Sequence, residues 1–135
     1  MHHRRIFPAW FLLLMTACIP APTDEQAIEE SIEATRDAQG RWPANAATTE
    51  GVHGMQALVA GYPDNGLTGG LLKDSLEERM GTIFVRCTME GEAHEDLHDY
   101  LLPLMGMYRE LPADPDSAQL AAIRLHLAAY DERFH

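Results

Sequence analysis

Four stretches of the chain carry apolar residues at intervals of three and four, and this periodicity restricts what the chain can fold into. The intervals match the 3.6-residue turn of an α-helix, so each stretch predicts a helix with one apolar face. The predicted helices span about residues 49–61, 71–90, 92–111 and 115–134. The positions that we expect to be buried are Val52, Met55, Val59, Tyr62, Leu72, Leu76, Met80, Ile83, Cys87, Ala93, Leu97, Leu101, Leu104, Tyr108, Leu120, Ile123, Leu127, Tyr130 and Phe134.

Short loops separate these helices. GYPDNG and LPADPDS read as turns, Gly91 separates the second predicted helix from the third, and Asp114 is expected to cap the last helix. No segment alternates apolar and polar residues long enough to predict a strand. We therefore predict an all-α fold, an up-down antiparallel four-helix bundle. An additional short N-terminal helix is expected from about residue 24 to 39, because Thr23 and Gln26 have the spacing of a capping box.

The N-terminus reads as a secretory signal. Arg4 and Arg5 precede an apolar run, IFPAWFLLLM, which is too short to span a bilayer as a helix. Small residues follow the run and lead to Cys18. These features predict a signal peptide over residues 1–17, a tether over 18–23 and a bundle domain over 24–135.

The sequence MTAC at residues 15–18 resembles the lipobox of bacterial lipoproteins, with Met15 where the family usually has Leu. The resemblance implies cleavage before Cys18 and acylation of that cysteine. Several acyl chains anchor a protein stably in a bilayer. Ile19 follows the cysteine where family members that stay in the inner membrane usually carry Asp. We therefore expect an outer-membrane anchor, with the domain in the periplasm.

The excess of acidic residues restricts the classes of molecule that the protein is expected to bind. Without the signal peptide, eight basic residues stand against 21 acidic ones. Such a surface disfavours nucleic acid and anionic membranes. The cysteine count is also informative, because acylation of Cys18 leaves Cys87 without a partner for a disulfide within the chain. A lone thiol in an oxidising compartment is expected to be buried or used.

Metal-donor side chains concentrate in VRCTMEGEAHEDLH, residues 85–98. Cys87 and His94 flank Gly91 at similar distances, and His98 follows His94 by one helical turn. In an antiparallel bundle the segment EGVHGM, residues 50–55, lies at the same end. The predicted metal site therefore consists of Cys87, His94, His98, His53, Met55 and Met89.

The donor types leave the metal open. Cysteine and histidine suit Zn²⁺, whereas a thiolate with thioethers suits Cu(I), which we favour. Non-covalent haem between His53 or His98 and Met55 is a lesser alternative.

Two further hypotheses compete with the metal site. Cys87 beside His94 would form a thiol–imidazole pair if Glu95 or Asp96 oriented the imidazole, but a position on the buried stripe argues against an enzyme. The other hypothesis is a non-enzymatic lipoprotein, structural or protein-binding, without a metal site. It requires an exposed apolar surface.

Overall fold

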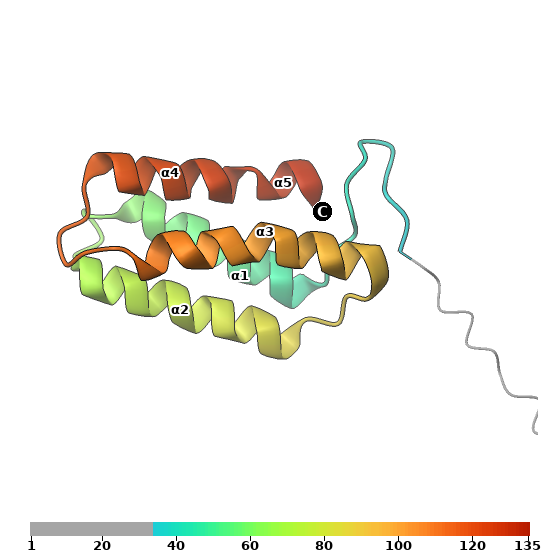
Figure 1. Cartoon of the computed structure of the whole chain (residues 1–135), viewed down its shortest axis with the longest axis horizontal. Helices are drawn as coiled ribbons and strands as arrows, with labels where there is room; N and C mark the ends of the chain where they lie inside the picture. Colours follow the sequence, from blue (N-terminus) through green and yellow to red (C-terminus); the bar gives the residue numbers. More distant parts are fainter. Residues whose placement is uncertain (1–33) are drawn as a thin grey trace, which may run out of the picture. The chain divides into compact units, whose positions relative to one another are not determined.

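The structure, a computed structural model, describes residues 34–135 and confirms the all-α bundle. The predicted signal peptide, Cys18 and the tether lie outside the described residues. The helices are α1 (Ala46–Gly61), α2 (Gly69–Arg86), α3 (Gly91–Arg109), α4 (Ser117–Ala128) and the short α5 (Tyr130–Arg133). Each of α1 to α4 packs against its two neighbours in a closed ring, so α4 contacts both α1 and α3 (Figure 1).

The predicted apolar stripes form one core. Leu72, Leu76 and Ile83 of α2 are fully buried, as are Leu101 and Leu104 of α3. Three aromatic side chains, Tyr100, Tyr130 and Phe134, fill the end of the core at which α5 stops. Spacing alone therefore predicted most of the interior. Tyr62 and Cys87 are only partly buried, and the buried Trp42, Tyr100 and Leu111 were not predicted.

Several predicted helix ends are wrong. Helix α1 begins at Ala46 rather than residue 49, and α2 ends at Arg86 rather than residue 90. The last predicted helix is two helices, and its cap is Asp116 rather than Asp114. Asp116 forms a capping box with Gln119, in which each side chain bonds the other residue's backbone N–H.

The predicted N-terminal helix is wrong over its described part, since residues 34–39 are not helical. They lead instead into an extended segment that pairs with the C-terminus. The backbone N–H of Trp42 donates to the carbonyl of Arg133 at 2.8 Å, and that of His135 donates to the carbonyl of Trp42 at 3.0 Å. This segment lies at the end of the bundle where α1 and α3 begin and α2 and α5 end (Figure 1). We call this end of the bundle the proximal end.

Candidate functional site

The linker between α2 and α3 positions the predicted metal donors. Cys87 is the C-cap of α2, and its N–H donates to the carbonyl of Ile83 at 2.8 Å while its own backbone is already extended. Gly91 begins α3 with a φ of +59°, a conformation that strains residues with a Cβ. The linker thus turns the chain within four residues and brings the first turn of α3 beside Cys87.

Cys87 and His94 meet, as their similar distances from Gly91 predict. The Sγ of Cys87 lies 3.7 Å from the Nδ1 of His94. The ring of His94 in turn contacts that of His98, with 4.3 Å between centroids and an angle of 50° between the ring planes. His98 is exposed and presents its ring to the edge of Phe84 on α2. The two imidazoles therefore lie side by side on α3, with His98 the more exposed.

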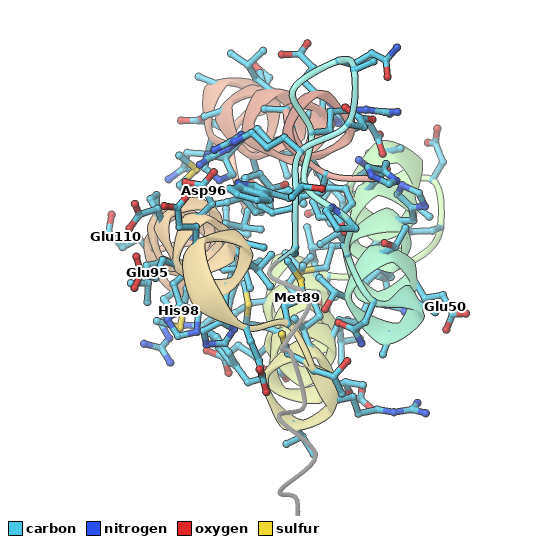
Figure 2. The ribbon with its side chains drawn as sticks, turned by 90° about the vertical axis from the view of Figure 1, so that its right-hand side faces the viewer. Glu50, Met89, Glu95, Asp96, His98 and Glu110 are labelled. Carbon is cyan, nitrogen blue, oxygen red and sulfur yellow. The ribbon has the colours of Figure 1, made fainter. Side chains whose placement is uncertain are left out.

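The donors on α1 lie elsewhere. The Nε2 of His53 is 2.9 Å from the Oδ1 of Asp131, so this histidine links α1 to α5 on the outer surface. Met55 is fully buried in the core. Met89 is not on α1 but in the linker between α2 and α3, and it is partly buried against the core. Figure 2, viewed towards the proximal end, shows Glu50 of α1 and His98 of α3 on opposite sides of the bundle.

The predicted metal site is therefore wrong. Among residues 34–135 no group of three or more His, Cys, Asp or Glu side chains is placed to hold a metal ion. The physical reason is rotation about the helix axes. His53 follows the buried Val52 by about 100°, which turns it out of the core, and His98 is exposed on the outside of α3. A copper or zinc function is not supported.

The carboxylates that would orient His94 are engaged or turned away. The Oδ2 of Asp96 accepts hydrogen bonds from the Nε1 of Trp42 at 2.6 Å and from Arg36 at 2.7 Å. Glu95 is exposed and projects outward from α3 (Figure 2). Cys87 and His94 thus form a pair without the third group that a thiol–imidazole mechanism uses.

Sequence reasoning missed the cluster around Asp96. The Arg36 guanidinium lies 4.2 Å from the Trp42 ring centroid, and Arg133 approaches the same carboxylate at 3.7 Å. Burial pushes the pKa of Asp96 up, but the hydrogen bonds from Trp42 and Arg36 and the two guanidinium charges outweigh it and leave that pKa below its usual value. This cluster fastens the N-terminal segment to α3.

A surface feature on α4 was also missed. The helix, SAQLAAIRLHLA, has a single arginine, and its exposed positions are four alanines and Leu125 besides Ser117 and Arg124. Leu125 is 77% exposed. A groove of about 420 Å³ runs beside it, between α3 and α4; its lining residues are Met107, Ala122, Leu125, His126, Ala128, Ala129 and Glu132. We call this the α3/α4 groove.

A second hollow lies on the other side of α4, against α1. It has a volume of about 390 Å³ and contains polar side chains, among them Gln56, Arg124 and Asp131. The guanidinium of Arg124 donates to the carbonyls of Val59 and Tyr62. This hollow is therefore partly closed by groups that already bond each other, which distinguishes it from the α3/α4 groove.

No helix within residues 34–135 is long and apolar enough to cross a membrane. Comparison of the whole chain with known proteins found no match: no family model, no curated protein and no solved structure corresponds to it.

Proposed function

We propose that the protein is a lipid-anchored envelope protein whose helical domain binds another protein and carries no catalysis. The single observation that supports binding is the exposed strip of α4 beside the α3/α4 groove, where Leu125 and several alanines face solvent. A surface helix normally has one apolar stripe, directed to the core, and charged residues opposite. An exposed apolar strip on the side of a helix that faces away from the core favours a second packing partner.

The N-terminal sequence supports the anchor. The basic start, the apolar run and MTAC together resemble a lipoprotein signal, and acylation of Cys18 would hold the domain at the outer membrane, facing the periplasm. The described chain enters the bundle at the proximal end, whereas the α3/α4 groove lies along its side. An anchored domain would therefore leave that groove open to a partner.

Two cysteine variants test the anchor. Expressed in a Gram-negative bacterium, Cys18→Ser should lose radiolabelled palmitate and move from the membrane fraction to the soluble periplasm. Cys87→Ser is the matched control and should keep both label and location. A Cys18→Ser protein that still carries the label would refute acylation at this residue.

Site-directed photo-cross-linking tests binding. A photoreactive residue at position 125 should give a defined cross-linked product in living cells, and the same residue at position 71, an exposed leucine on α2, should not. The captured protein, once purified, should bind the chain directly and lose affinity for Leu125→Glu. Identical products from both positions, or unchanged affinity, would contradict the proposal.

A further inference from the structure

We propose, on the basis of the function above, that the α3/α4 groove takes one kind of partner: an amphipathic helix of another protein, with an apolar face flanked by Lys and Arg. The groove lies beside α4 where Met107 of α3 approaches it, and a hollow between two packed helices suits a third helix. Helix α4 has 12 residues, or about 18 Å, enough to lie along three turns of a partner helix.

The apolar contacts come from both walls. Leu125 of α4 and Met107 of α3 are the large side chains of the lining, and both are exposed. Between them lie alanines, which let another helix backbone approach closely. A partner helix would bury these side chains, and burial of exposed apolar surface stabilises the complex.

The charges around the groove select a basic partner. Among the groove's lining residues the one carboxylate is Glu132, and none is Lys or Arg. Glu110, the C-cap of α3, lies three residues beyond Met107 and adds a second carboxylate on this side.

The nearest arginines are committed elsewhere. Arg124 donates to the carbonyls of Val59 and Tyr62, and Arg133 approaches Asp96. His126 is also engaged, since its Nε2 lies 2.8 Å from the carbonyl of Tyr100.

The same charges disfavour the other occupants. A second copy of this chain would bring one acidic rim against another, in a protein with 21 acidic and 10 basic residues. An anionic lipid surface would meet the same repulsion. A helix with Lys and Arg beside its apolar face complements both the apolar lining of the groove and the carboxylates at its edge.

A designed peptide pair tests this directly. We would titrate the full mature chain, with Cys18→Ser for solubility, with a peptide of about 16 residues that has Leu and Ala at helical spacing and Lys elsewhere. The matched peptide has Glu in place of Lys. The lysine peptide should bind in calorimetry at roughly 150 mM salt, and the glutamate peptide should not.

Variants of the protein separate docking from general attraction between opposite charges. Leu125→Glu should weaken the binding of the lysine peptide about tenfold, because it places a charge in the apolar contact. Non-specific attraction would instead strengthen with the added negative charge. Leu71→Glu on α2 adds the same charge away from the groove and should not weaken the binding of the lysine peptide.

Three results would overturn the proposal. One is affinity for the lysine peptide that is unchanged or raised by Leu125→Glu; another is a dimer in sedimentation that Leu125→Glu dissociates, which would make a second copy the occupant. The third is binding to vesicles of zwitterionic or anionic lipid that depends on Leu125. If the peptide fails while position 125 cross-links a purified partner, the partner's chemistry is wrong and the proposed function stands. If position 125 cross-links nothing, the proposed function fails as well.

Discussion

The indole Nε1 of Trp42 donates a 2.6 Å hydrogen bond to the Oδ2 of Asp96, across 54 residues of sequence. Because Arg36 donates to the same oxygen, one carboxylate joins the N-terminal segment to α3. Trp42 also pairs through its backbone with the C-terminal residues. Both ends of the described chain are thus fastened at the proximal end.

Replacing this carboxylate should destabilise the fold. We expect Asp96→Asn to lower the free energy of unfolding by about 1–2 kcal/mol at neutral pH, since hydrogen bonds to a charged, partly exposed group contribute on that order. Urea unfolding followed by circular dichroism and Trp fluorescence measures the change. Asp99→Asn, an exposed position on the same helix, is the control and should change little.

The effect of Asp96 should also depend on pH. Its pKa in the fold is lowered, so its contribution is present above the usual pKa of about 4 and is lost as the pH falls through the folded value. Wild type and Asp96→Asn should therefore converge in stability as the pH falls below the lowered pKa of Asp96 in the fold. A difference that persists undiminished in acid would mean that charge does not carry the interaction.

Two glycines on α2 should respond in opposite directions to alanine. A Cβ at Gly69 would lie 2.5 Å from the carbonyl oxygen of Ala113 and 2.6 Å from that of Pro112, and backbone cannot easily retreat. We expect Gly69→Ala to cost about 1–3 kcal/mol.

Gly81 is the matched position, because nothing lies within 4 Å of its Cβ direction and its φ is helical. Gly81→Ala should stabilise the protein by about 0.5–1 kcal/mol, as the unfolded chain loses freedom. Thermal unfolding of the two variants gives the sign of each change. Equal effects would show that the contact between α2 and the α3–α4 loop is not tight in solution.

The Cys87–His94 pair gives a prediction about metal removal. These two donors are adjacent, but the described residues supply no third donor to the pair. Chelators of zinc or copper should therefore leave the melting temperature unchanged. A decrease on chelation that Cys87→Ser abolishes would contradict this placement of the side chains.

The sequence predicted the position of a residue along the bundle axis better than the direction in which its side chain points. Counting residues from Gly91 placed Cys87 beside His94, because rise per residue is fixed. The outward direction of His53 was also within reach, since Val52 belongs to the buried stripe. The contact of Trp42 with Asp96 was not, because contacts across 54 residues leave no periodic pattern. The end of α2 was missed because residues 88–90 carry no stop signal and Gly91 starts the next helix rather than ending this one.

The buried tyrosines predict the alkaline limit of stability. Burial raises the pKa of Tyr100 and Tyr130, and the hydroxyl of Tyr100 donates to the carbonyl of Leu127 at 3.3 Å. A raised folded pKa means that the unfolded chain ionises first, so stability should be retained up to about pH 10, the usual tyrosine value, and should fall above it. Tyrosinate absorbance should rise together with the loss of helical circular dichroism. Tyr100→Phe removes one of these groups and should make the alkaline loss of stability shallower; an unchanged slope would show that Tyr100 ionises freely in the folded protein.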